Sequence, residues 1–214
     1  MMPISDDNSL RKTLPIVTYC LIALNVLFYF FEMAGGEEFI MRWAFVPSRF
    51  LSDPYADSST IFTSMFMHAG IAHLVGNMLY LWIFGDNVED SIGKTPFLIF
   101  YFVCGISAIF SQMLFNPEST VPNVGASGAI AGVLGAYIYL FPHGKINVIL
   151  GRSMQMMPAY IVIGFWFVLQ FISGVGSTAH LEGSGGVAYM AHIGGFLMGL
   201  VIMFFYQQIN AANR

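Results

Sequence analysis

Residues 187–206, VAYMAHIGGFLMGLVIMFFY, form a run of twenty residues without a charged side chain. This is about the length that an α-helix needs to cross the hydrocarbon core of a bilayer. The apolar residues show no alternation with a period of two, which favours a helix over a strand of a membrane β-barrel. Five more apolar stretches occur, at about 14–33, 61–84, 96–115, 127–142 and 157–173. The sequence therefore predicts an all-α membrane protein, a bundle of six transmembrane helices.

The composition of the whole chain also indicates a membrane protein. The 214 residues are 57% apolar or aromatic and only 9% charged, whereas soluble domains carry about 45–50% apolar and about 25% charged residues. So few charged side chains could not cover the surface of a soluble particle, and the same figures exclude disorder, collagen and coiled coils. The formal net charge of −4 argues against a nucleic-acid partner.

The basic residues predict the orientation of the spans. With six spans, both tails and the even-numbered loops lie on one side of the membrane, and the positive-inside rule places that side in the cytoplasm. We therefore expect a cytoplasmic tail over 1–13, a six-span domain over 14–206 and a tail over 207–214. The cytoplasmic side would hold six basic residues, namely Arg11, Lys12, Lys94, Lys145, Arg152 and Arg214, against Arg42 and Arg49 outside.

The first outward loop, about 34–60, is long and rich in aromatic residues. Such a loop is predicted to lie in the membrane interface rather than to extend into water. Its aromatic residues are Trp43, Phe45, Phe50 and Tyr55. The two cysteines, Cys20 and Cys104, lie inside apolar runs, so we expect small buried hydrophobic side chains and neither a disulfide nor a metal pair.

Polar side chains inside spans are costly and are therefore functional candidates. His73 and Asn77 in the second span are four residues apart and share one helix face. On their own they would be read as an interhelical hydrogen-bond pair. Ser127 opens the fourth span, where a serine among small residues is usually a packing residue. Its surroundings nearly match the hydrolase pattern G-x-S-x-G, but Ala129 replaces the last glycine and no strand precedes it.

These polar residues share one depth in the membrane. His192 lies about one and a half turns into the sixth span. Spans two, four and six all begin on the outer side, so His73, Asn77, Ser127 and His192 are all predicted in the outer half of the bilayer. A serine needs an adjacent base to become a nucleophile, and a His–Asn pair can supply donors to a tetrahedral oxyanion.

Small residues predict which spans meet. Such residues let helix backbones approach closely, so a contact between spans four and six would bring the serine within reach of the histidine. The small residues recur every four positions, as Gly128 and Gly132 in span four and as Ala191, Gly195 and Gly199 in span six.

Three motifs together resemble the rhomboid family of intramembrane serine proteases, over nearly all of residues 14–206. Each motif is weak alone, but their order, spacing and placement on spans two, four and six make the combination specific. The motifs are His73-Leu-Val-Gly-Asn77, Gly125-Ala-Ser127-Gly128, and Ala191-His192-Ile-Gly-Gly195-Phe-Leu-Met-Gly199. A further stretch, from Gly85 through Glu89 to Gly93, matches a family element that we interpret as structural.

The resemblance implies a Ser–His dyad, with Ser127 as nucleophile and His192 as general base and acid. It also implies that His73, Asn77 and the backbone N–H of Ser127 stabilise the oxyanion. The implied substrates are single-span membrane proteins, cut near the outer face. Resemblance to the prokaryotic type of six-span core implies the plasma membrane, with lipid around the protein. No cofactor is implied. A metal site is not expected, because H-E-x-x-H is absent and no intramembrane carboxylate neighbours the two histidines in sequence.

The chain departs from the family pattern at two places. Some members carry a tyrosine four residues after the nucleophile, where it stacks on the catalytic histidine, but this chain has Ala131. We expect Tyr189 or Tyr137 to support the ring instead. A Trp-Arg pair common in the first loop is reversed here, as Arg42-Trp43.

The remaining polar positions have ordinary interpretations. His68 is predicted to be an interfacial histidine near the water route to the site, and His143 and His180 to be solvated in loops. Residues 174–179, GVGSTA, resemble a dinucleotide fingerprint but lack the βαβ context, so they are predicted to form a flexible loop. The glycine-rich segment 173–186 has the composition of a mobile cap.

Two other functions stay open at this point. One is a catalytically inactive rhomboid-like binding protein, although such a relative is free to lose any of the four polar residues that this chain retains. The other is a small transporter, although no inverted repeat is visible and the interiors of the spans carry almost no charge.

Overall fold

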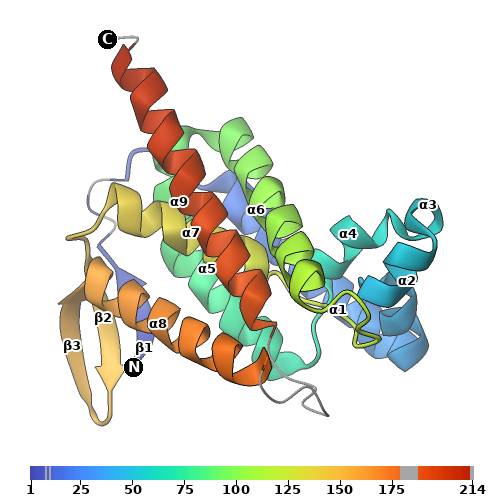
Figure 1. Ribbon diagram of the computed structural model, residues 1–214. Helices are drawn as coiled ribbons and strands as arrows, with labels where there is room; N and C mark the ends of the chain where they lie inside the picture. The colour runs from blue at the N-terminus through green and yellow to red at the C-terminus, as the bar shows by residue number, and fades with distance from the viewer. Residues whose placement is uncertain (8, 10, 179–187, 213–214) are drawn as a thin grey trace.

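The computed structural model describes residues 1–212 except 8, 10 and 179–187. Most of this part of the chain is helical (Figure 1). The long helices are α1 (Ile16–Trp43), α5 (Ile71–Ile92), α6 (Lys94–Phe115), α7 (Ser127–Leu140), α8 (Ala159–Thr178) and α9 (Tyr189–Ala212). Four short ones lie between α1 and α5, namely α2 (Pro47–Ser52), α3 (Pro54–Asp57), α4 (Thr60–Thr63) and the 3-10 helix η1 (Ser64–Phe66).

Length and apolar composition separate these helices into two groups. Among the described residues, α1, α6 and α9 are long and apolar enough to cross a membrane, and a fourth span results if Pro54–Phe66 and α5 count as one bent unit. The apolar helix α7 and the apolar part of α8 are shorter. The chain is therefore a mostly helical protein with three or four candidate spans.

The short helix α7 is the centre of the bundle. Residues 128–137 are buried, and α7 packs against α5, α6, α8 and α9. The view in Figure 1 shows α9 passing across α7. Their backbones touch at glycines, because a Cβ at Gly195 would lie 2.0 Å from the carbonyl oxygen of Gly128, and one at Gly199 would lie 2.1 Å from that of Gly132. The predicted small-residue contact between these two segments is therefore present.

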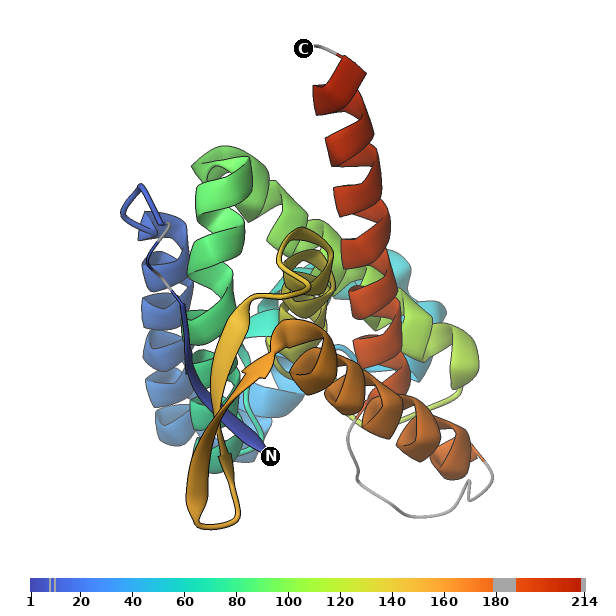
Figure 2. The same ribbon diagram turned by 90° about the vertical axis from the view of Figure 1, so that its left-hand side faces the viewer.

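A three-stranded antiparallel sheet corrects the prediction of an all-α protein. Its strands are β1 (Met2–Asp6), β2 (Lys145–Leu150) and β3 (Ser153–Pro158), in the order β1-β2-β3, and Figure 2 shows them side by side. Ile146 and Val148 alternate onto the buried face, which is the period-2 pattern of a strand. This alternation is visible in the sequence. The pairing with β1 is not, because it joins residues more than 130 positions apart.

The predicted loop at 34–60 and the predicted span at 61–84 also differ from the structure. Helix α1 continues to Trp43 and kinks at Gly36, whose φ of +62° is rare for residues with a side chain. The second long helix begins only at Ile71, and the segment before it is bent away by 76°. Hydropathy could not reveal this bend, because Met65 and Met67 around it are buried in the protein and are as apolar as a lipid-facing residue.

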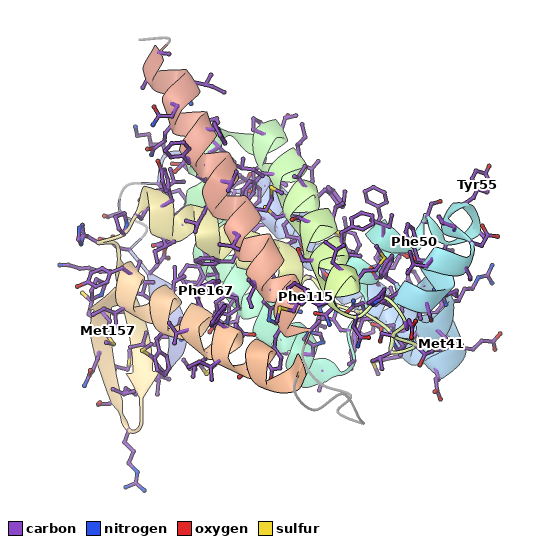
Figure 3. The ribbon with its side chains drawn as sticks, viewed as in Figure 1. Met41, Phe50, Tyr55, Phe115, Met157 and Phe167 are labelled. Carbon is purple, nitrogen blue, oxygen red and sulfur yellow. The ribbon has the colours of Figure 1, made fainter. Side chains whose placement is uncertain are left out.

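Two smaller predictions, on Cys20 and on residues 174–178, are corrected as well. Cys104 is buried, but Cys20 is exposed, and both are free thiols. Phe45 of the first loop is buried against Phe50, whereas Tyr55 points away from the protein (Figure 3) and is exposed. Residues 174–178 continue α8 instead of forming a loop. Most of the predicted cap at 173–186 lies outside the described residues.

Candidate active site

Ser127 is the first residue of α7, and the chain reaches it through Gly125. Gly125 has a φ of +126°, and a Cβ there would lie only 2.8 Å from Cε1 of His73. Its backbone N–H donates to the carbonyl oxygen of Ser64. Only glycine suits this position, because a side chain would be strained by the backbone and would push His73 away.

Ser127 and His192 lie within hydrogen-bond distance. Oγ of Ser127 is 2.8 Å from Nε2 of His192, although the two residues are 65 positions apart in sequence. The contact follows from the packing of α7 on α9, since the backbones touch where Gly195, about one turn beyond His192, meets Gly128, the residue after Ser127. This arrangement can activate a serine hydroxyl, because a neutral imidazole nitrogen can accept its proton.

Helix α8 holds the other side of the His192 ring. Nδ1 of His192 is 2.7 Å from Oε1 of Gln170, and the ring of Trp166 lies 5.8 Å from the imidazole centroid at an interplanar angle of 40°. One turn separates Trp166 from Gln170, so both project from one helix face. The prediction that Tyr137 supports this ring is wrong. Tyr137 packs on Phe84 and donates a hydrogen bond to Asp6 near the far end of α7. The ring packed on His192 belongs to Trp166 rather than to Tyr189.

No role for Trp166 or Gln170 was predicted from the sequence. Gln170 is a polar residue within the apolar run 157–173. Polar groups inside spans are functional candidates. This rule selects Gln170 as well as His73 and Asn77. The signal was therefore present in the sequence, but the histidine that Gln170 contacts could not be identified from it.

A cavity of about 900 Å³ opens beside Ser127, lined among others by His73, Asn77, Tyr80, Ser127, Trp166 and His192. Nδ2 of Asn77 is buried and has no hydrogen-bond partner in the described part of the chain. Buried donors are nearly always paired, so an unpaired one at a cavity wall is unusual. It is available to a negatively charged oxygen that forms beside the serine. A second groove, of about 520 Å³ between α1 and α5, is lined almost entirely by apolar side chains and lies away from these groups.

His68 is not an interfacial histidine. It is 1% exposed, its ring lies 5.1 Å from that of His73, and its backbone N–H donates to both carboxylate oxygens of Glu32 at 2.9 Å. The turn before α5 therefore packs against α1 rather than facing the interface. His143 is exposed and contacts Tyr160, whereas His180 lies outside the described residues.

Glu89 joins α5 to the start of α1. Its carboxylate accepts the backbone N–H groups of Val17 at 3.0 Å and Thr18 at 2.7 Å, and the Thr18 hydroxyl at 2.8 Å. A carboxylate at a helix N-terminus pairs with unsatisfied N–H groups and with the positive end of the helix dipole. This position, about twelve residues beyond Asn77 on the same helix, is a structural one. Among the described residues, no group of three or more His, Cys, Asp or Glu side chains could hold a metal ion.

Comparison with known proteins gives the following matches. The rhomboid domain family matches residues 56–209. The Rhomboid protease GluP of Bacillus subtilis is 31% identical over 174 residues, which are 79% of this chain and 33% of that protein. The mitochondrial Rhomboid protein 1 of Saccharomyces cerevisiae is 28% identical over 194 residues, 86% of this chain and 51% of that protein. The Putative rhomboid protease YdcA of B. subtilis is 29% identical over 170 residues, 79% of this chain and 83% of that protein. The chain thus spans about a third of the length of the first relative and about half of the length of the second.

Proposed function

The chain belongs to the rhomboid family of multi-pass membrane proteins, and we propose that it is an intramembrane serine endopeptidase. Its substrates are single-span transmembrane proteins, cut near the outer face of the membrane. The observation that carries the proposal is the 2.8 Å contact between Ser127 Oγ and His192 Nε2 at the wall of a large cavity. The printed names of two relatives, Rhomboid protease GluP and Putative rhomboid protease YdcA, support the same activity.

The proposed reaction follows from the positions of these groups. His192 Nε2 takes the proton of Ser127 as Oγ attacks the scissile carbonyl, and His192 then returns it to the leaving amine. The negative charge on the carbonyl oxygen is stabilised by His73, by the unpaired Nδ2 of Asn77 and by the backbone N–H of Ser127. Water from the cavity then releases the acyl group by the same steps. No cofactor takes part in this scheme.

We propose six spans, formed by α1, α5, α6, α7, α8 and α9, within a catalytic domain over residues 14–206. Helix α7 has 14 residues, which at 1.5 Å per residue extend about 21 Å, less than the ~30 Å of the hydrocarbon core. Its outer end would therefore lie in a recess below the membrane surface, and the cavity beside Ser127 supplies the water that hydrolysis needs. The tails 1–13 and 207–214 face the cytoplasm of a prokaryotic plasma membrane, and lipid surrounds the rest.

The test is cleavage of tagged single-span substrates in liposomes by the purified protein and by Ser127→Ala. The substrates carry small or helix-breaking residues near the outer interface, because a peptide bond in a helix is shielded from attack. Ser52→Ala, at an exposed serine of α2, is the matched control. We expect the control to cleave like wild type and Ser127→Ala to yield no product.

Equal product from wild type and Ser127→Ala would overturn the proposal. Labelling with a serine-directed fluorophosphonate adds a test that needs no substrate, because it should require both Ser127 and His192. A binding protein or a transporter would give neither result, since its function would depend on the shape of the cavity and not on the serine hydroxyl.

A further inference from the structure

Helix α8 contacts His192 through a polar group that the two-residue dyad does not use. Gln170 lies in the apolar part of α8, where a polar side chain is costly, and its Oε1 is 2.7 Å from Nδ1 of His192. We propose that Gln170 is a positioning residue that orients His192, so that the site consists of Ser127, His192 and Gln170. This inference rests on the proposed function.

The hydrogen bond selects one tautomer of the histidine. A carbonyl oxygen such as Oε1 can only accept, so the proton of the neutral ring lies on Nδ1. Nε2 then presents its lone pair to the Ser127 hydroxyl, 2.8 Å away. In the other tautomer Nε2 would donate to Ser127 and could not take its proton. Gln170 therefore keeps the ring in the form in which it can act as a base.

The same contact stabilises the ring while it carries a proton. When His192 has taken the proton of Ser127, Nδ1–H is part of a cation, and a hydrogen bond from a charged donor is stronger than a neutral one. Among the described residues, the groups that face the ring are Ser127 from α7, Trp166 and Gln170 from α8, and, at longer range, His73 from α5. Within the described residues no ion pair or hydrogen bond joins a carboxylate to this ring. The neutral amide of Gln170 is thus the acceptor at Nδ1.

Two carboxylates buried in the bundle are engaged elsewhere. Glu32 accepts from the backbone of His68, and Glu89 accepts from Val17 and Thr18. The residues beside Gln170 in sequence, Val168, Leu169 and Phe171, are exposed and apolar. An apolar residue at 170 would suit this apolar stretch of α8, so the glutamine has a reason beyond packing.

The experiment compares three variants in liposomes. Gln170→Met keeps the length of the side chain and removes the acceptor, and Gln170→Glu keeps the acceptor and adds a charge. Gln208→Met, at an exposed glutamine of α9, is the matched control. The readouts are kcat and KM for one single-span substrate from about pH 5 to about pH 9, together with the thermal unfolding of each variant.

We expect Gln170→Met to lower kcat about 10-fold with little change in KM, which corresponds to the loss of one hydrogen bond. Gln170→Glu should retain kcat within a few-fold near and above neutral pH. Its rate should begin to fall at a higher pH than that of wild type on the acid side, because a carboxylate holds the protonated ring more tightly. The control should match wild type in every readout.

Three results would overturn the inference. They are an unchanged kcat in Gln170→Met, an acid limb that does not move in Gln170→Glu, or losses that follow thermal stability alone. If Gln170→Met folds poorly, the acid limb of Gln170→Glu decides, because that variant keeps the size and the acceptor. Cleavage that depends on Ser127 but not on Gln170 refutes this inference alone, whereas cleavage that does not depend on Ser127 refutes the proposed function.

Discussion

The two ends of α7 carry polar groups that differ in their hydrogen bonding within the protein. At its start, Ser127 lies beside a cavity of about 900 Å³ and close to an unpaired Asn77 donor. Near its other end, the Tyr137 hydroxyl donates to Asp6 at 2.8 Å. Asp6 also accepts from Asn87. A helix of 14 residues thus separates groups that line a cavity from groups that are bonded within the protein itself.

The partner at the second end comes from the N-terminal strand. Asp6 is the last residue of β1, and the neighbouring Asp86 pairs with Arg11 at 2.6 Å. One oxygen of Asp6, Oδ1, is buried without a partner among the described residues. Burial raises the pKa of Asp6 to about 6, and the carboxylate of Asp86 adds to the rise, although the hydrogen bonds from Tyr137 and Asn87 oppose it. We interpret this end as an anchor for β1, and the first end is the proposed catalytic site.

Removing one hydroxyl from each end should give the largest contrast. Ser127→Ala should lower cleavage by at least ~10³-fold without changing the thermal unfolding temperature, because the nucleophile is lost and the small neighbours tolerate alanine. Tyr137→Phe should leave kcat within a few-fold of wild type. Both are measured by product yield in liposomes. A similar loss of cleavage in the two variants, with both proteins folded, would refute the contrast.

Asn77→Ala should have the next largest effect. Loss of one oxyanion donor in a serine hydrolase lowers the rate roughly 10²- to 10³-fold, and His73 and the backbone N–H of Ser127 remain here, so we expect about 10²-fold in kcat. KM should change little, since the charge exists only after attack. Asn87→Ala is the comparison at the anchored end, and it should lower stability rather than kcat. A raised KM with unchanged kcat for Asn77→Ala would instead place this side chain in substrate binding.

Asp6→Ala should weaken the anchor. The change leaves the Tyr137 hydroxyl and the Asn87 amide without this acceptor, and an unpaired buried polar group costs about 1–3 kcal/mol. Thermal or denaturant unfolding in detergent should detect the loss, while fluorophosphonate labelling of Ser127 in the folded protein stays as in wild type. A loss of labelling at unchanged stability would show that β1 acts on the site and not only on the fold.

The smallest expected effect is a pH dependence of stability from Asp6. Its pKa is raised from 3.8 to about 6, so ionised Asp6 opposes folding above about pH 6. That cost disappears as the pH falls from about 6 to about 4. Two pKa units correspond to about 2.7 kcal/mol, and partial exposure of the carboxylate reduces this to about 1 kcal/mol.

Asp6→Asn should remove this part of the pH dependence and should raise stability at pH 7.5. Unfolding temperatures at pH 5 and pH 7.5 for wild type and the variant give the comparison. Asp7→Asn, at the exposed neighbouring aspartate, controls for the change in net charge. If the unfolding temperature changed equally between the two pH values in wild type and in Asp6→Asn, the assignment of this pH dependence to Asp6 would be wrong.

The sequence by itself determined the class of the protein and the identity of its main polar residues. Composition and apolar runs depend on local residues, so they identified a membrane protein without any contact being known. Counting residues along the predicted spans put His73, Asn77, Ser127 and His192 at one depth, which stays a prediction. The glycine spacing also indicated that two particular segments meet, because small residues every four positions form a continuous face on a helix.

Only the tertiary structure decided which side chains meet across elements. Gln170 and Trp166 lie against His192, and Asp6 lies against Tyr137, through contacts between segments 22 to 131 positions apart. Such pairs depend on how helices rotate and tilt as they pack, and many pairings fit one hydrophobic pattern equally well. The bend before α5 and the pairing of β1 with β2 were decided in the same way. A buried apolar residue looks the same in sequence whether lipid or protein surrounds it.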